Sequence, residues 1–514
     1  MLLLLVSSLG FVCLSSLVLY FYYLLCLKPE RQREKLRKQG INGPTPSFLY
    51  GNIVDIKRLR SEMVMKKTGR RQMEHTYMAD ILPHIQKWGE NYGTLFAYSM
   101  GNMVILHVTD PDLAREICQC KDTEFGRPLY LRKNRGALLG NSIISSAGDL
   151  WSHQRKTIAP EFLMGTVKGM VDMMVECSIK MLNAWESKVN NGAAGIADIR
   201  VDEELKNLSA DIISRTIFGS NYVTGKEVFL KIRAIMDVLA KQTNLLGIPG
   251  VRYLPTKTNR EAWRLNKEIT STLLELANHR KVKETEESDL LQVLINGSSG
   301  INGWIGLHKR TRFIVDNCKA MYFAGHETSS TAATFALLLL AYYPEWQTRV
   351  RAEINDICGG KLPDMDMLRK MKTLTMVIQE TLRLYPTTPF LNREAFQDMK
   401  FKDYVIPKGI NIWISIGELH QNCEIWGPDA CEFNPERFAS GIASACKMPH
   451  MYMPFGNGLR TCLGQNFAMV EMKIVLSLIV SKFRFTVSPN YEHNIVWRLV
   501  LEPVNGVSLQ MERI

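Results

Sequence analysis

The chain begins with one uninterrupted apolar segment. No charged side chain occurs from Leu2 to Leu27, and about 20 apolar residues are enough for a helix to cross a bilayer. A cleaved secretory signal would carry a basic start, a shorter apolar part and a small-residue cleavage site, and none of these is clear here. We therefore expect residues 2–27 to form a transmembrane anchor.

Basic residues follow the apolar segment directly. Six lysines and arginines lie between Lys28 and Lys38, and such flanks remain on the cytosolic side of a membrane. Pro44 and Pro46 then prevent a helix from continuing. The pattern predicts a basic, proline-rich hinge over residues 28–50 and a cytosolic domain over residues 51–514.

The composition excludes several classes of protein. With 46% hydrophobic and 22% charged residues, the chain is neither disordered nor of low complexity. The 11 cysteines are odd in number and contain no C-x-x-C pair, so they indicate neither a disulfide framework nor a zinc site. The net charge of +12 accompanies no nucleic-acid-binding module. We expect a membrane surface or an acidic protein as partner, and no nucleic acid.

Helical patterns dominate the body and short β-rich runs accompany them. We predict helices over residues 311–343 and 367–384 and from about 462 onward, and strands over 94–98, 103–108 and within 396–415. Pro407–Gly409 resembles a hairpin connection, and the charged run Arg280–Asp289 predicts a solvated loop. Without repeats or a linker after residue 50, the chain is expected to form one large domain, mainly α with a minor β part.

The segment around Cys462 is the most informative part of the chain. Phe455 to Gly464 has the sequence FGNGLRTCLG. A cysteine at a helix start lies near free N–H groups that favour the thiolate, and Arg460 adds positive charge. Gly458 and Gly464 would let a flat ligand approach the loop closely. Such a thiolate suits a haem iron; the alternative is a buried structural cysteine beside an ordinary glycine turn.

This segment resembles the haem-binding signature F-x-x-G-x-R-x-C-x-G of the cytochrome P-450 superfamily. Three further segments resemble family motifs in the family's order: AGHET at 324–328, E-x-x-R at 380–383 and PERF at 435–438. The similarity covers essentially the whole chain, including the anchor and hinge of microsomal members. It implies the cytochrome P-450 fold and a haem b whose iron is ligated by Cys462.

The resemblance also implies roles for particular residues. Glu327 and Thr328 would relay protons during dioxygen activation, and Gly325 would allow a ligand to approach the helix. Without the haem signature, the interpretation of these residues would be a polar cluster inside a helix whose hydrogen bonds are satisfied within the protein. Trp151 and Arg155 share one helix face and would donate to the haem carboxylates. The cofactor-binding residues implied are Trp151, Arg155, Arg393, Phe455, Arg460 and Gly464.

Glu380 and Arg383 belong to a predicted structural network. At positions i and i+3 they share a helix face and can form a charge-assisted pair, and Arg437 can reach the same carboxylate. Because a buried network is costly unless fully hydrogen-bonded, we expect it to specify the segment that presents Cys462. The alternative is an ordinary surface pair.

The chain must receive electrons from elsewhere, because no G-x-G-x-x-G fingerprint lies at a strand–helix junction. The resemblance implies NADPH as the electron source and a separate flavin protein, NADPH-cytochrome P-450 reductase, docking on the Cys462 side. It also implies a single-pass protein of the endoplasmic reticulum membrane with a cytosolic catalytic domain.

Several non-catalytic segments resemble one plant clan of the family. The segments similar to the clan are residues 46–52, 210–216, 255–260 and 425–429, and those similar to its gibberellin and ent-kaurenoid oxidases are 198–205, 315–319, 375–379 and 440–447. The resemblance implies a monooxygenase that hydroxylates or epoxidises a hydrophobic diterpenoid acid in hormone metabolism. Open alternatives are a cytokinin side-chain hydroxylase, another terpenoid or fatty-acid hydroxylase, and a haem protein or isomerase that does not activate dioxygen. We expect the substrate pocket to be lined by residues 127–141, 243–251, 320–324 and 387–391 and near Val504.

Overall fold

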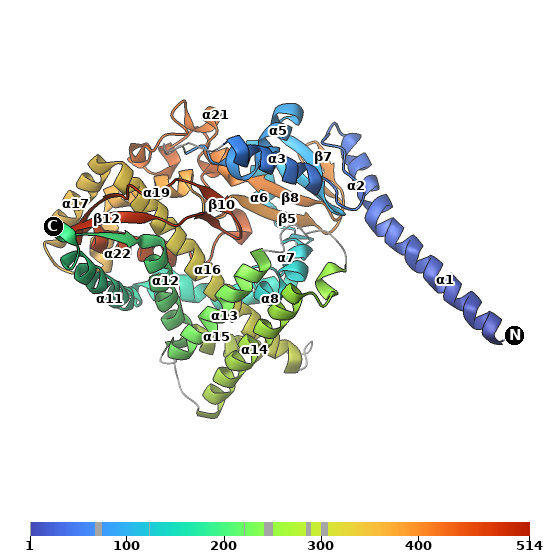
Figure 1. Cartoon of the computed structure of the whole chain (residues 1–514), viewed down its shortest axis with the longest axis horizontal. Coiled ribbons are helices and arrows are strands. Elements are labelled where there is room, and N and C mark those ends of the chain that lie inside the picture. Colours follow the sequence, from blue (N-terminus) through green and yellow to red (C-terminus); the bar gives the residue numbers. More distant parts are fainter. Residues whose placement is uncertain are drawn as a thin grey trace.

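The computed structural model describes residues 2–66, 75–122, 124–219, 222–240, 250–283, 289–299 and 307–514. Figure 1 shows one helix projecting alone from a body in which helices pack beside a smaller region of sheet. The predicted class, mainly α with a minor β part, is confirmed.

The projecting helix contains the apolar N-terminal segment. It consists of α1 (Leu2–Tyr22), the π-helical turn Tyr23–Leu27 and α2 (Lys28–Arg37). The stretch Ser8–Arg37 is long and apolar enough to cross a membrane and is not buried by the body over its apolar window. The basic flank, predicted to be part of a hinge, is therefore helical as far as Arg37. It docks on the body, since Gln32 Nε2 donates to the Lys408 carbonyl at 2.6 Å.

A five-stranded sheet lies at the end of the body nearest α2. Its order is β1-β2-β8-β5-β3, with β2 and β8 parallel and the other pairs antiparallel. The strands are β1 (Leu95–Met100), β2 (Met103–Val108), β3 (Phe125–Gly126), β5 (Phe390–Ala395) and β8 (Asn411–Ser415). Every residue of β2 and β8 is buried, because helices and loops cover both faces of the sheet.

The hairpin expected at Pro407–Gly409 is wrong. This segment joins β7 (Tyr404–Ile406) to β8, and these two strands belong to different sheets. The hairpin partner of β7 is β6 (Met399–Phe401). The turn between β6 and β7 includes Lys402, whose φ of 49° is left-handed. The other strands are β4 (Ile196–Arg200), β9 (Phe483–Val487), β10 (Ile495–Trp497), β11 (Leu501–Pro503) and β12 (Ser508–Arg513).

The long helix α16 (Leu307–Tyr342) crosses the body, which confirms the predicted helix. It packs on α12 (Val201–Phe218) and α22 (Gln465–Lys482). Gly325 lines the cavity, as the predicted ligand approach requires, and it also has a packing reason: a Cβ there would lie 2.6 Å from Ile213 Cδ1 of α12. The glycine therefore permits two helices to approach each other.

Two further predictions about helices need correction. The helix predicted over 367–384 is interrupted at Met371 and forms α18 (Met365–Lys370) and α19 (Lys372–Leu384). The ends of the charged run 280–289 are buried, because Arg280 pairs with Asp289 and donates to the Phe218 carbonyl at 2.7 Å. Residues 284–288 of that run lie outside the described residues.

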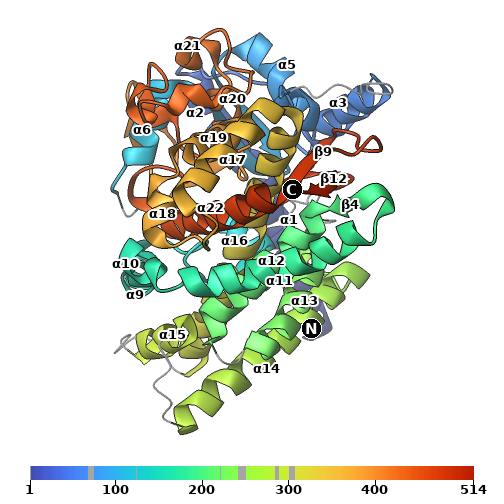
Figure 2. The same cartoon turned by 90° about the vertical axis from the view of Figure 1, so that its left-hand side faces the viewer.

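Figure 2 shows α13, α14 and α15 at the opposite end of the body from α5 and α21. The remaining α-helices are α3 (Ile53–Lys66), α4 (Met78–Ile81), α5 (Pro83–Tyr92), α6 (Pro111–Gln119), α7 (Leu129–Asn134), α8 (Gly136–Leu139), α9 (Gly148–Ile158), α10 (Met164–Lys168), α11 (Val171–Asn190), α13 (Tyr222–Ala240), α14 (Lys257–Lys283), α15 (Leu290–Ser299), α17 (Pro344–Cys358), α20 (Ile416–His420) and α21 (Cys423–Trp426).

Candidate functional site

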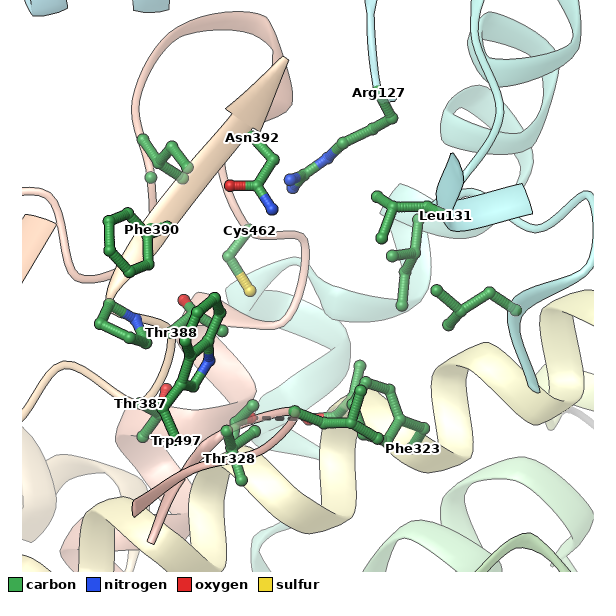
Figure 3. Close-up of a pocket in the computed structure, with 18 of the residues that line it drawn as sticks. Arg127, Leu131, Phe323, Thr328, Thr387, Thr388, Phe390, Asn392, Cys462 and Trp497 are labelled. Atoms are coloured by element: carbon green, nitrogen blue, oxygen red, sulfur yellow. Dashed lines mark hydrogen bonds between the residues drawn. The ribbon is translucent and has the colours of Figure 1, made fainter. Parts of the chain in front are cut away.

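A cavity of about 600 Å³ lies between α16, α9, β5 and the loop that carries Cys462. Figure 3 shows the Cys462 sulfur pointing into it, with Thr328 and Phe323 of α16 on one side and Arg127 and Leu131 on another. Its lining is mostly apolar and, among the described residues, includes no aspartate or glutamate. Pockets of about 300–1,000 Å³ are typical for cofactors and small ligands.

The cysteine loop is held in place by backbone contacts. The Cys462 N–H donates to the Phe455 carbonyl at 2.8 Å. Gly458 has a φ of 74°, and a Cβ there would lie 2.0 Å from the Cys118 carbonyl oxygen. Gly458 is therefore required by close packing against the end of α6, and not by the approach of a flat ligand. Phe455 and Gly464 line the cavity.

The surroundings of Cys462 oppose a free thiolate. The helix expected to start at Cys462 begins at Gln465. Cys462 is exposed to the open cavity, yet desolvation by the surrounding protein raises the pKa of its thiol above the usual value, although the Gly464 amide and the positive charges of Arg155 and Arg127 counteract this effect. Because a coordinating metal deprotonates a thiol directly, a thiolate here calls for a bound cation at the sulfur.

Trp151, Arg155 and Arg460, predicted from distant parts of the sequence, come together at this cavity. The Arg460 guanidinium lies 4.3 Å and that of Arg155 5.8 Å from the centre of the Trp151 ring. Arg460 Nη1 donates to the Ser146 carbonyl at 3.0 Å, and Arg155 Nη1 to the Thr461 carbonyl at 2.9 Å. Each guanidinium retains further donors for a ligand.

Arg127 begins the predicted pocket segment 127–141, but the sequence analysis did not count it among the cofactor-binding residues. It lines the cavity, and no side chain among the described residues forms an ion pair with it. Burial and the neighbouring charge of Arg393 lower the pKa of Arg127 to about 9. Burial and Arg127 lower that of Arg460 likewise to about 9. No local motif marks Arg127, because it is the pairing of β3 with β5 that brings it here.

Arg393 occupies a different position from the one predicted. It is 3% exposed and is not among the lining residues. Its Nη1 donates to the carbonyl of Asn392 at 3.0 Å. Asn392 does line the cavity, and its Oδ1 is buried with no hydrogen-bond partner among the described residues. β5 therefore contributes Phe390, Leu391 and Asn392 to the cavity lining, and not Arg393.

These residues fit a haem. A ligand that fills the cavity would remove water from Arg127, Arg155 and Arg460, and cations without water require an anionic partner, which the described lining, free of carboxylates, does not offer. A haem brings two carboxylates for such cations and an iron for the sulfur of Cys462.

Thr328 and Glu327 lie on different sides of α16. Thr328 lines the cavity, and its Oγ1 donates to the Ala324 carbonyl at 2.6 Å. Glu327 lies outside the cavity lining, with Oε1 3.1 Å from His326 Nδ1 and Oε2 3.8 Å from Lys206 Nζ. Burial raises the pKa of Glu327, but His326 and Lys206 outweigh it, so the pKa lies below its usual value.

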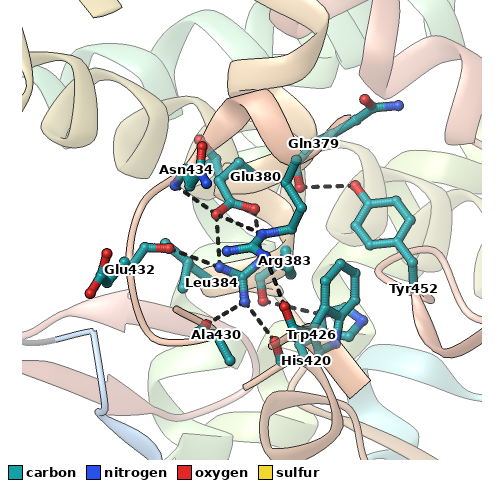
Figure 4. Close-up of polar contacts among 12 residues, drawn as sticks. Gln379, Glu380, Arg383, Leu384, His420, Trp426, Ala430, Glu432, Asn434 and Tyr452 are labelled. Carbon is teal, nitrogen blue, oxygen red and sulfur yellow. Dashed lines mark hydrogen bonds and ion pairs between the residues drawn. The ribbon is translucent and has the colours of Figure 1, made fainter. Parts of the chain in front are cut away.

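Glu380 and Arg383 form a fully buried pair beside the segment that leads to Cys462. Two bonds of 2.7 Å join the Arg383 guanidinium to the two carboxylate oxygens. Figure 4 shows the guanidinium also donating to backbone carbonyls. The carbonyl acceptors are those of His420 (2.7 Å), Ala430 (2.5 Å) and Glu432 (3.0 Å). The pair therefore links α19 to residues 420–432, which precede the cysteine loop in the sequence.

Arg437 joins this network mainly through another acid. Its Nε lies 3.7 Å from Glu380 Oε1, whereas its Nη2 lies 2.7 Å from Asp429 Oδ2. Two further contacts continue toward the cysteine loop: the Met453 N–H donates to His420 Nε2 at 3.0 Å, and the Tyr452 hydroxyl to the Gln379 carbonyl at 3.0 Å.

The predicted pocket segments are present in part. Residues 387–391, Ala324 and several residues of 127–139 line the cavity. Val504 does not, and residues 496–500 take its place. Residues 243–249 lie outside the described part of the chain.

A mainly helical body around a largely apolar cavity, with a cysteine and with Arg127, Arg155 and Arg460 in its lining, fits a haem-thiolate protein. A family model described as Cytochrome P450 matches residues 72–507. This protein belongs to the cytochrome P450 family, whose members are haem-dependent monooxygenases with a cysteine thiolate ligand, a redox partner and small hydrophobic substrates.

Curated relatives from plants match nearly the full length of the chain. Cytochrome P450 714C2 of Oryza sativa subsp. japonica is 50% identical over 95% of this chain and 94% of its own length. Cytochrome P450 714B3 of Zea mays is 43% identical over 97% and 94%. Cytochrome P450 714A2 of Arabidopsis thaliana is 41% identical over 94% and 93%. The predicted gibberellin-oxidase subgroup fits this group of relatives.

A solved structure shares the fold. The retinoic acid bound cyanobacterial CYP120A1 superposes with a TM-score of 0.75, 22% identity and coverage of 92% of this chain and 100% of that one.

Proposed function

We propose that this protein inserts one oxygen atom of O₂ into a hydrophobic diterpenoid acid of the gibberellin or ent-kaurenoid type. The observation that carries this proposal is the largely apolar cavity that ends at the Cys462 sulfur and at the Thr328 hydroxyl. The subgroup-like segments in the sequence support the substrate class. A cytokinin side-chain hydroxylase is the second candidate.

The haem-facing residues have the task of binding and orienting the cofactor. When bound, the haem supplies the one-electron and dioxygen chemistry of the reaction. Cys462 would ligate the iron, and Trp151, Arg155, Arg460 and Arg127 would receive the carboxylates. Arg393 would act on them only through its charge on Arg127 and Arg460. Phe455 and Gly464 would contact the ring from the cysteine loop.

Thr328 would hold and move a proton at its Oγ1. Because this hydroxyl uses its hydrogen to donate to the Ala324 carbonyl, its oxygen can accept a hydrogen bond from a donor in the cavity. Glu327 would supply the next proton from the side of α16 that faces away from the cavity, since its carboxylate contacts Lys206 and His326 rather than the cavity. Glu380, Arg383 and Arg437 would keep the cysteine loop in place.

The domain plan and the electron supply complete the proposal. Residues 2–27 would anchor the protein in the endoplasmic reticulum membrane, and residues 51–514 would form the cytosolic catalytic domain. Residues 28–50 would be the hinge that connects the two. Electrons would come from NADPH through NADPH-cytochrome P-450 reductase docking on the Cys462 side. Because charged surfaces steer association, turnover at limiting reductase should fall as salt rises, and salt-independent turnover would contradict this mode of docking.

The experiment uses microsomes that contain the full chain, the reductase and NADPH. A panel of gibberellins, ent-kaurenoic acid and cytokinins is incubated and analysed by mass spectrometry. We expect oxygenated diterpenoid acids from the native protein and none from Cys462→Ala, whose carbon monoxide complex should also lack the red-shifted Soret band of thiolate ligation. Cys423→Ala, at an exposed cysteine, is the control. Oxidation of cytokinins alone would overturn the substrate class.

Thr328→Ala tests the proton step separately. It should retain substrate binding and lose roughly 10²-fold in product formation, with NADPH consumption diverted to hydrogen peroxide. Thr334→Ala is the matched control, because its hydroxyl is similarly bonded to the Ser330 carbonyl at 2.8 Å but does not line the cavity. Unchanged product and peroxide in Thr328→Ala would exclude this role.

A further inference from the structure

A second cationic group lies in the cavity, apart from the haem-facing arginines. Arg60 and Lys57 of α3 are lining residues. The haem-facing arginines come from other segments, namely the connection after β3, α9 and the cysteine loop. Arg60 is exposed in the open cavity, yet desolvation by the surrounding protein still lowers the pKa of its guanidinium below its usual value.

Arg60 has no acidic partner among the described residues, which distinguishes it from neighbouring cations. Arg58, two residues earlier on α3, pairs with Asp55 at 3.2 Å and points to solvent. Arg498 also lines the cavity, but its Nη1 lies 2.9 Å from Glu502 Oε1. Water can solvate Arg60 in the empty cavity, but an apolar ligand that fills the cavity would displace this water, and the guanidinium would then need a partner on the ligand.

One polar side chain that lines the cavity with Arg60 has an unsatisfied atom. His84 is 3% exposed and lines the cavity, and its Nδ1 has no hydrogen-bond partner among the described residues. Burial and the charge of Arg60 hold the pKa of His84 well below its usual value, so the imidazole is neutral and can donate or accept. Tyr98, 1% exposed, lines the same part. Such convergent polar groups in an apolar cavity are typical of a ligand-orienting site.

We propose that Arg60 binds the carboxylate of the substrate, with His84 beside it, so that the apolar body of the acid extends along the cavity toward Cys462. A guanidinium can hold a carboxylate through two parallel hydrogen bonds, which would fix which end of the substrate faces the iron. This inference rests on the proposed function, because it assumes an acidic substrate. The same chemistry would also select an apolar acid of another class.

The test measures binding of paired ligands to the purified, haem-loaded full chain. Each ligand is offered as the free acid and as its methyl ester: a gibberellin, ent-kaurenoic acid and palmitic acid. The dissociation constant is read from the spin-state shift on titration. Hydrogen bonds to charged groups contribute about 1.5–3 kcal/mol, so Arg60→Gln should bind the preferred acid roughly 10- to 100-fold more weakly and bind its ester as the native protein does. Arg60→Lys should retain part of the preference for the acid, and Arg58→Gln all of it.

The outcomes separate this inference from the proposed function. Equal losses for acid and ester in Arg60→Gln, or no loss for either, would overturn the role of Arg60 even if gibberellins are oxidised. Arg60-dependent binding of palmitic acid alone would support the role of Arg60 and overturn the diterpenoid substrate. A native protein that binds no acid more tightly than its ester would overturn both. The haem content of each variant shows that it is folded.

Discussion

Two groups of arginines lie near the cysteine loop, one fully buried and one lining the cavity, and they are satisfied in opposite ways. The guanidinium of Arg383 makes five hydrogen bonds, two to Glu380 and three to backbone carbonyls. Since a guanidinium has five donors, none remains for a ligand. In the cavity, Arg155 and Arg460 each donate to one carbonyl, and Arg127 to none among the described residues.

The difference separates scaffold from site. A charge that the protein itself satisfies holds segments together and needs nothing more. A charge that the protein leaves unsatisfied destabilises the empty fold and is retained because a ligand completes it. The two groups should therefore respond oppositely to substitution: the first through stability, the second through cofactor affinity.

Removal of the Arg383 partner should have the largest effect. In Glu380→Ala the buried guanidinium would lose its carboxylate, at a cost of about 3–5 kcal/mol, and little haem-containing protein should accumulate. The measurement is the yield of the carbon monoxide complex per milligram of expressed chain. Glu436→Ala is the control, because its partner Arg349 is about half exposed and exposed pairs contribute about 0–1 kcal/mol. Normal haem content in Glu380→Ala would contradict the scaffold role.

Substitution in the cavity should act on the cofactor instead. Arg127→Gln removes one charge that faces the haem carboxylates, so haem should dissociate roughly 10- to 100-fold more readily, measured by its transfer to apomyoglobin. The haem-free protein should be no less stable than the native one in urea, because a buried repulsion with Arg393 is relieved. Arg132→Gln, at an exposed arginine of α7, should change neither quantity. If haem-free Arg127→Gln is clearly less stable in urea than the haem-free native protein, Arg127 has a structural role like that of Arg383.

The scaffold should also be sensitive to acid. Burial and Arg383 lower the pKa of His420 to about 3, whereas the unfolded chain protonates near 6.5. Above pH 6.5 both states are neutral; as the pH falls toward 3, only the unfolded state gains the proton, so stability decreases. Between pH 6.5 and 5 the loss is about 2 kcal/mol, measured by urea titration. His420→Asn should flatten this pH dependence, and His279→Asn, at an exposed position, should leave it intact.

Arg437 should give the smallest effect and refine the comparison. Its main partner, Asp429, is 33% exposed and can be solvated when left alone, and Glu380 keeps both bonds to Arg383. Arg437→Gln should therefore cost about 1 kcal/mol, seen as a small shift of the urea midpoint with normal haem content. A loss as large as that of Glu380→Ala would make Arg437 an equal member of the network.

Local patterns predicted the elements whose cause is local. The helix over 311–343 needed only periodicity and a proline stop, and the structure has it as Leu307–Tyr342. Failures occurred where a distant segment supplied the partner. Arg280 was predicted to be solvated because its neighbours are charged, but Phe218 and Asp289 bury it. Pro407–Gly409 resembled a hairpin, but the strands on its two sides pair elsewhere.

The identity of the chemistry was readable from the chain alone, because Cys462 and its flanking glycines and arginine form a contiguous motif. The location of the charges around it was not. Arg127 enters the cavity through the pairing of β3 with β5, and β5 contributes Asn392 to the lining but not Arg393. Likewise, Glu327 and Thr328 are adjacent residues of one helix, yet they face Lys206 and the cavity respectively. Motifs record which residue types a reaction needs; which of them meet the ligand depends on packing between segments far apart in the sequence, because side-chain direction and burial are set by neighbours that no local window contains.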